Sequence, residues 1–309
     1  MKLSIQTLLK EAVDYAGLFP PAGLDMASSI RNYGAYASGG NAWALGRFIV
    51  PVSRLEEFNF HIGTCAAESG AKWGKVEDQE KPWRLSAISD GDRKTDFERV
   101  KRFNVWHGER DETQRVTIDT IEVKTRYGEA ITATGNASPD SLRVFFEIPL
   151  DGQPEGLLTA IARAGGAAKV RTGGVAPRMV PTATTLVRFL DACFQAGVPF
   201  KATAGLRHPL HGVRSFNGEP GEQEGPTHGF LNLILCAAFM YDGMESKIAE
   251  DLLTEETVEA FRFGDSGIKW RDHEIGIETL GAARRDFALS FGSSSFEEPV
   301  KYLEAVGLL

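Results

Sequence analysis

Short apolar runs rich in β-branched and aromatic residues alternate with longer segments of helical periodicity over most of this chain. A run such as LRVFFEIPL at residues 142–150 is nearly continuously apolar, which is typical of a parallel-sheet strand covered on both faces. The segment that follows, PEGLLTAIARAGG at 154–166, has apolar residues at helical spacing and ends on glycine. Repetition of this strand–helix unit predicts an α/β protein with a parallel sheet.

The strand-like runs number eight, which is the number that closes a (β/α)8 barrel. They are expected at DYAGLF (14–19), 44–52, 83–89, 117–125, 142–150, 167–172, 199–205 and FRFGDS (261–266). An open, doubly wound sheet is the alternative, but no GxGxxG motif follows the first strand. We therefore expect one TIM-barrel domain over residues 1–309, with a helical C-terminal extension from about residue 268.

The longest Gly- and Pro-rich polar stretch, residues 208–229, follows the seventh expected strand. Loops that follow the strands of such a barrel lie at its C-terminal face, where active sites are built. A loop of this length is often a lid or a binding segment, and a surface insertion without either role is the alternative.

Two lysines occupy matching places in the sixth and seventh expected strands. Lys169 lies in AAKVRTGG (167–174), and Lys201 follows one strand–helix–strand unit later in PFKATAGLRH (199–208). Consecutive parallel strands are usually neighbours, so the two side chains are expected to lie side by side. Close like charges and burial both disfavour a charged lysine, so one amine is expected to be neutral near neutral pH and able to form a Schiff base with a carbonyl. The alternative is that both lysines are solvated or paired with acidic side chains.

These motifs resemble those of the deoxyribose-phosphate aldolase family, whose members are class I, Schiff-base-forming aldolase barrels. KVRTG at 169–173 resembles the family's strand-six motif KTSTG, and KATAGLR at 201–207 resembles its strand-seven motif KASGGIR. The resemblance covers about residues 10–266 in short islands and implies the same barrel. The weaker islands, in the family's order, are Val13–Asp14, IVP (49–51), IDTIEV (118–123), LRVFFEIPL (142–150) and FRFGDS (261–266).

The resemblance implies catalytic roles for four residues. Lys169 would form the Schiff base and Lys201 would depress its pKa. Asp14 and Glu122 would move protons to and from the bound intermediate, with Glu122 standing where the family has the shorter aspartate. Structural roles are the alternatives: a helix or turn cap for Asp14, and an ion pair with Lys124 or with a neighbouring strand for Glu122.

A second group of residues is expected to bind the substrate around the lysines. Glu147, at the end of the fifth strand, would orient a lysine or serve as a structural ion-pair partner. The full set of expected substrate-binding residues is Arg171, Thr203, Gly205, Arg207, Glu147, Gly264 and Ser266.

The chain departs from the family's pattern at positions that point to a different substrate. Asp265 replaces a small neutral residue near the family's phosphate site, where a carboxylate would repel a phosphate dianion, and Ala204 replaces a glycine. Arg171 replaces a small residue on the strand face of Lys169, and a guanidinium there can grip a carboxylate, although a buried pair with Glu147 is the alternative. We therefore expect a small carbonyl substrate that is not phosphorylated in the family's manner, with a keto acid as one candidate.

The composition limits which classes of binding partner and which cellular compartment we expect. The net charge is −8 and no basic stripe is visible, which argues against a nucleic-acid partner. The most apolar run, FLNLILCAAFM at 230–240, is too short to cross a membrane and is expected to be a buried helix. Three cysteines without CxxC spacing fit a reducing compartment. We expect a cytoplasmic protein without a cofactor, metal or membrane partner, and leave a homo-oligomer open.

Two other classes of function compete with an aldolase-type carbon–carbon lyase. His208 and His211, followed by His228, are candidate zinc ligands together with Glu122 or Glu147, although their loop is rich in glycine and proline. A barrel that binds a small carbonyl metabolite without converting it is the second. A purely structural protein is the weakest interpretation, because the lysine motifs are paired.

Overall fold

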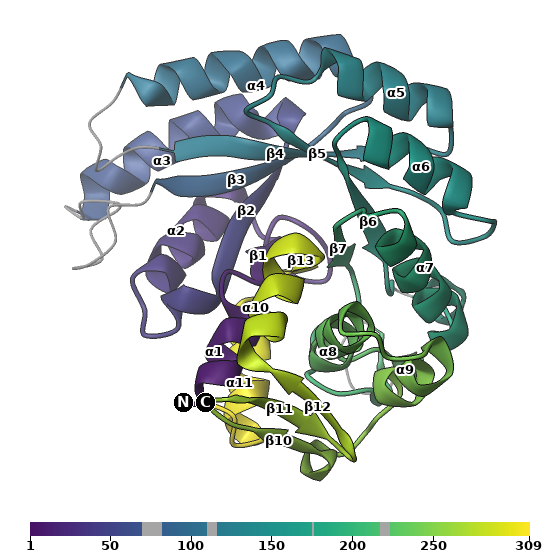
Figure 1. The fold of residues 1–309 in the computed structure, drawn as a ribbon. Coiled ribbons are helices and arrows are strands. Elements are labelled where there is room, and N and C mark those ends of the chain that lie inside the picture. Colours follow the sequence, from purple (N-terminus) through teal and green to yellow (C-terminus); the bar gives the residue numbers. More distant parts are fainter. Residues whose placement is uncertain (70–81, 110–115, 175, 217–222) are drawn as a thin grey trace.

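Eight parallel strands close into a barrel in the computed structural model, which describes residues 1–69, 82–109, 116–174, 176–216 and 223–309. The alternation in the sequence thus correctly predicts a TIM barrel, and the helices form a ring around the strands (Figure 1). In their order around the barrel the strands are β1 (Val13–Tyr15), β13 (Ala288–Ser293), β7 (Phe200–Thr203), β6 (Ala167–Arg171), β5 (Arg143–Glu147), β4 (Val116–Lys124), β3 (Trp83–Ile88) and β2 (Leu45–Pro51).

Each barrel strand except β7 is followed by a helix as its next regular element of more than one turn. The helices in the described residues are α1 (Leu3–Leu9), α2 (Met26–Ala37), α3 (Leu55–Ser69), α4 (Arg93–Gly108), α5 (Gly128–Ala137), α6 (Glu155–Arg163), α7 (Ala183–Gln195), α8 (Phe230–Tyr241), α9 (Ser246–Leu253), α10 (Ile277–Asp286) and α11 (Glu297–Ala305). Apolar side chains fill the layer between these helices and the strands.

The ends of α7 place strand β7. Thr182 Oγ1 accepts a hydrogen bond from Thr185 N at 3.2 Å and so satisfies an amide at the start of the helix. Gly197 adopts a left-handed φ of +63° after the last turn, which ends the helix and redirects the chain. The strand that carries Lys201 begins three residues later, at Phe200.

The eighth barrel strand is β13, so its predicted position at 261–266 is wrong. Phe261–Phe263 forms β10 of a separate antiparallel sheet with β11 (Gly267–Trp270) and β12 (His273–Gly276). A turn of only three residues after β10 returns the chain antiparallel, whereas a parallel neighbour needs a long crossover. This sheet contacts α1 and α10 outside the barrel (Figure 1).

This shift also moves the C-terminal boundary of the barrel. The predicted extension from about residue 268 contains α10 and β13, which belong to the barrel, and only α11 follows the last strand. A helical C-terminal segment is therefore present, as expected, but it is shorter.

The long loop after β7 contains a hairpin. Strands β8 (Gly212–Ser215) and β9 (Glu224–Thr227) pair antiparallel, and residues 217–222 of the predicted loop lie outside the described residues. The apolar run that follows forms α8, which is buried from Phe230 to Met240, as predicted. Within the described ranges, no helix is both long and apolar enough to span a membrane.

Candidate active site

Lys169 and Lys201 lie directly opposite each other on neighbouring strands. They are register partners in the β6–β7 ladder, and both side chains point into the barrel. Lys169 is 6% exposed and Lys201 is fully buried. The prediction that the two lysines lie side by side inside the barrel is confirmed by this register.

Three carboxylates separate and flank the two ammonium groups. Glu122 lies between them, with Oε2 at 2.7 Å from Lys169 Nζ and Oε1 at 2.7 Å from Lys201 Nζ. Glu147 Oε2 lies 2.7 Å from Lys169 Nζ, and Asp14 Oδ2 lies 2.5 Å from Lys201 Nζ. These five side chains, Glu147, Lys169, Glu122, Lys201 and Asp14, form a continuous row of alternating charge, which we call the interior ion-pair row.

Hydroxyl and amide groups donate hydrogen bonds to the two most deeply buried acids of the row, Glu122 and Asp14. Ser86 Oγ donates to Glu122 Oε1 at 2.7 Å, and Ser290 Oγ donates to Asp14 Oδ2 at 2.7 Å. The amide of Arg47 donates to Asp14 Oδ1 at 2.8 Å, so Asp14 does not cap a helix or a turn. A side chain at Gly46 would meet Asp14 Oδ1 at 2.4 Å, and glycine is required for that approach.

Sequence analysis missed both serines. Ser86 lies on β3 and Ser290 on β13, each at a position that faces into the barrel and is surrounded by apolar neighbours in the chain. A small polar residue at an inward position of an otherwise apolar strand is the signal that marks them.

The charges of the row determine which protonation states it favours. Burial opposes ionisation of Glu122, but the ammonium groups of Lys169 and Lys201 outweigh it and hold the pKa of this carboxyl far below its usual 4.5. Burial likewise opposes a charged Lys169, but Glu122 and Glu147 outweigh it and raise its pKa above 10.5. The prediction that Lys201 lowers the pKa of Lys169 is therefore wrong for the free protein, because a carboxylate lies between the two amines.

The alternative in which the lysines pair with acidic side chains is what the structure shows, and Glu147 is the ion-pair partner of Lys169. Two other proposed pairs, Glu122 with Lys124 and Glu147 with Arg171, do not form. Lys124 is exposed and lies 3.9 Å from Glu147 rather than beside Glu122. Arg171 ends β6 as an exposed residue, two positions beyond Lys169, and the structure shows no ion pair between it and Glu147. Arg171 thus remains a cation at the C-terminal end of the strand that carries Lys169.

The residues expected around the end of β7 are close to the row but have structural contacts. Thr203 Oγ1 lies next to Gly292 of β13. Gly205 has a φ of +80° and packs so closely on Gly173 that a Cβ at Gly173 would meet its Cα at 2.7 Å. Ala204, which replaces a glycine of the family's motif, adopts a left-handed φ of +66° that is unfavourable for alanine.

Arg207 is held by an acid from the C-terminal helix. Its Nε and Nη2 donate to the two carboxylate oxygens of Glu298 in α11 at 2.8 and 2.6 Å. Arg207 was expected to bind the substrate, but in the structure its guanidinium is already paired with Glu298.

Gly264 and Ser266 are not part of this site. Both lie in the turn after β10, and Gly264 O accepts from Ser4 N at 3.2 Å. Asp265 Oδ1 accepts from Leu3 N at 2.9 Å in the same turn. Asp265 therefore does not face the active site and cannot repel a phosphate there, contrary to the prediction, because the predicted strand is not in the barrel.

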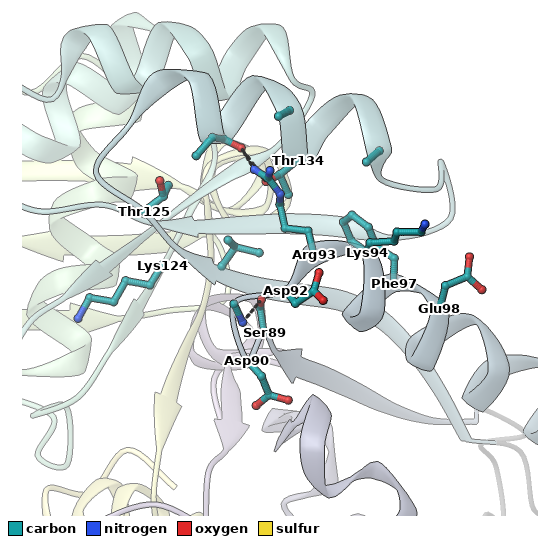
Figure 2. Close-up of a pocket in the computed structure, with 15 residues that line it drawn as sticks. Ser89, Asp90, Asp92, Arg93, Lys94, Phe97, Glu98, Lys124, Thr125 and Thr134 are labelled. Atoms are coloured by element: carbon teal, nitrogen blue, oxygen red, sulfur yellow. Dashed lines mark hydrogen bonds between the residues drawn. The ribbon is translucent and has the colours of Figure 1, made fainter.

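A cavity lies outside the barrel, and no residue of the interior ion-pair row lines it. It has a volume of about 800 Å³ and is bounded by the loop after β3 and by α4, β4 and α5 (Figure 2). Arg93 of α4 reaches across it and donates to Ala130 O at 3.1 Å and to Thr134 Oγ1 at 3.3 Å. Figure 2 shows charged groups of both signs around this cavity, including Lys94 and Glu98.

The histidines of the zinc alternative each have a different neighbour. The ring of His208 lies 4.2 Å from that of Tyr302, His211 Nδ1 lies 3.2 Å from Glu256 Oε1, and His228 Nε2 lies 2.7 Å from Pro181 O. Glu122 instead contacts the two lysines. Among the residues with described coordinates, no three His, Cys, Asp or Glu side chains are grouped to hold a metal ion.

The TIM barrel is shared by many enzymes, whose active sites lie at the C-terminal ends of the strands. No protein-family model, curated protein or solved structure matches the chain.

Proposed function

We propose that the protein is an aldolase-type lyase that forms a Schiff base between Lys169 and a small carbonyl substrate. The observation that carries this proposal is the position of Lys169 Nζ between two carboxylates, each at 2.7 Å. Of the two lysines, Lys169 is the partly exposed one, so a substrate reaches it before Lys201.

Formation of the Schiff base begins with a proton transfer. The Lys169 ammonium passes a proton to Glu122 or Glu147, and the neutral amine adds to the carbonyl carbon. The resulting carbinolamine takes up a proton on its hydroxyl and loses water, which leaves a protonated imine. Because this imine carries the same positive charge as the ammonium, the carboxylates that raise the pKa of Lys169 also stabilise it.

Cleavage of a carbon–carbon bond then needs a base and an acid. A base removes the proton of the β-hydroxyl, the bond between the α- and β-carbons breaks, and its electron pair moves into the imine to give an enamine. Protonation at the α-carbon and addition of water release the second product and the amine. Glu122 can exchange protons with Asp14 through Lys201, so the row supplies a path for both transfers.

Reductive trapping tests the proposal. Borohydride added with a panel of small aldehydes and ketones should attach the carbon skeleton to Lys169, as identified by peptide mass. Lys169→Arg, which keeps the charge but cannot form the imine, should abolish the label. Lys269→Arg is the matched control, because Lys269 forms an exposed pair with Glu274 in the outer sheet. Labelling that persists in Lys169→Arg would contradict the assignment.

A second measurement distinguishes an enzyme from a binding protein. An aldolase that forms the enamine should exchange an α-hydrogen of its substrate in deuterium oxide, as observed by NMR. A protein that forms the imine at Lys169 without exchange or cleavage would be a binder of carbonyl metabolites.

A further inference from the structure

A second, small cavity lies at the ends of β6 and β7, the two strands that carry the lysines. Its volume is about 20 Å³, which is enough for a group the size of a water molecule or a carboxylate oxygen. Backbone of the two strand ends forms one side and the β8–β9 hairpin forms the other. Its lining includes Thr172, Arg207, His208 and Arg214.

Arg214 of β8 brings an unpaired cation to this cavity. Its Nε is buried and has no hydrogen-bond partner, and no acidic side chain in the described part of the chain pairs with its guanidinium. The side chain folds back over its own strand, where a Cβ at Gly212 would lie 3.3 Å from Arg214 Nη2. A buried donor without an acceptor is unfavourable, and a bound anion would satisfy it.

The other basic groups around the cavity carry no free positive charge. Arg207 is paired with Glu298 through two hydrogen bonds. Burial, together with Arg214 and Arg207, lowers the pKa of His208 to about 4, so its ring is neutral at pH 7. Among the described residues that line the cavity, with Glu298 counted beside Arg207, the net charge is therefore one positive charge, that of Arg214.

We propose that the substrate of Lys169 carries a carboxylate at the end away from its carbonyl, and that Arg214 binds this group. The proposal rests on the proposed Schiff-base function. One planar guanidinium matches one carboxylate in charge and shape. A phosphate dianion would need more room and more positive charge, and it would approach the carboxylate of Glu298 beside Arg207.

The position of the cavity limits the length of the substrate. Thr172, in its lining, lies three positions beyond Lys169 and directly follows the end of β6, which corresponds to about 10 Å of extended chain. The Lys169 side chain covers part of that distance. The carbonyl and the carboxylate would then belong to a molecule of about four to six carbons.

Trapping with matched aldehydes tests this inference. The probes are 4-oxobutanoate, its methyl ester, and 3-oxopropyl phosphate, and the readout is the concentration that half-saturates borohydride labelling of Lys169. The carboxylate should half-saturate at a concentration about tenfold or more below that of the ester. Arg214→Gln should remove this advantage without changing labelling by the ester. Arg262→Gln, on the exposed side of β10, is the matched control and should keep it.

The outcomes separate this inference from the proposed function. Equal trapping of carboxylate and ester at Lys169 overturns the inference and leaves the Schiff-base function intact. Arg214-dependent preference for the phosphate overturns the assignment of a carboxylate. If no probe labels Lys169, the proposed function fails, and the anion site is tested by NMR titration with butanedioate, which has no carbonyl. Loss of butanedioate binding in Arg214→Gln supports the site, whereas equal binding, or none to either protein, overturns it.

Discussion

Lys169 and Lys201 are register partners on adjacent strands, and the carboxylate of Glu122 bridges their ammonium groups at 2.7 Å on each side. The bridging carboxylate offsets the repulsion between the two ammonium groups, and together with Glu147 it favours the protonated form of Lys169. A Schiff-base lysine in such a setting becomes reactive by passing a proton to a neighbouring acid, and the row provides two acids for Lys169.

Replacing Glu122 by glutamine should destabilise the protein and make Lys169 easier to deprotonate. The change removes one partner of two buried ion pairs, so we expect the free energy of unfolding to fall by about 3–5 kcal/mol in urea denaturation. The pH at which Lys169 is half-labelled in reductive trapping should move down, since a carboxylate that raises its pKa is gone. Glu274→Gln, in the exposed pair with Lys269, should change stability by less than about 1 kcal/mol. A label whose pH dependence matches the wild type would show that Glu122 does not control Lys169.

Stability should decrease on acidification because the pKa of Glu122 is depressed in the folded state. The unfolded chain then binds a proton that the folded protein does not, so the free energy of unfolding falls as the pH drops below about 4.5 and continues to fall toward the folded pKa. Lys169 acts in the opposite range: its raised pKa contributes stability below 10.5 that is lost as the pH rises further. Urea titrations from acid to neutral pH should show a shallower acid limb for Glu122→Gln than for the wild type. Equal slopes would mean that the carboxyl is protonated in the native state.

Most of the barrel follows from sequence periodicity, and the exception is informative. Seven strands form where apolar, β-branched runs are expected, because strands covered on both faces need such runs. FRFGDS has the composition of a barrel strand, but Phe261–Phe263 pairs with the strand immediately after it. Sequence periodicity does not show whether a strand pairs with the barrel or with a neighbouring hairpin strand. The true eighth strand, ALSFGS, is rich in small residues because its inward side chains, such as Ser290, must leave room for Lys201 and Asp14.

The five charged residues of the interior ion-pair row were predictable from the sequence, but the two serines that bind its acids and the electrostatics of the row were not. The matched positions of Lys169 and Lys201, one crossover unit apart, place them together in a parallel barrel. The bridging role of Glu122 depends on the register of β4, two strands away from β6, and short-range patterns do not encode it. Likewise, the unpaired state of Arg214 depends on how a hairpin folds over the strand ends.

The loops after β6 and β7 pack closely where Gly173 meets Gly205, so a larger residue at Gly173 should destabilise the protein. Gly173→Ala would place a Cβ at 2.7 Å from the Cα of Gly205, and neither backbone can move without disturbing its strand. We expect a loss of about 1–3 kcal/mol in the free energy of unfolding. Gly156→Ala in α6 is the matched control, because no atom lies within 4 Å of its added Cβ, and better helix propensity should leave stability unchanged or raise it by up to about 1 kcal/mol. Equal effects of the two changes would mean that the loops separate easily.

The ion pair between Arg207 and Glu298 joins the segment after β7 to α11. Replacing Arg207 and replacing Glu298 should have different effects on trapping at Lys169. Arg207→Gln should increase amide hydrogen exchange in α11 and lower stability by about 1 kcal/mol or less, because the pair is partly exposed. It should leave trapping at Lys169 within about twofold of the wild type, since the lost guanidinium was already paired. Glu298→Gln should loosen α11 to the same extent but also remove a negative charge from beside the cavity that contains Arg214, so an anionic aldehyde should half-saturate at a lower concentration. Lys301→Gln, in an exposed pair one helical turn apart within α11, should alter neither property. If Arg207→Gln instead abolishes trapping of neutral and anionic aldehydes alike while α11 stays protected, Arg207 contacts the substrate directly and its pairing with Glu298 is broken during the reaction.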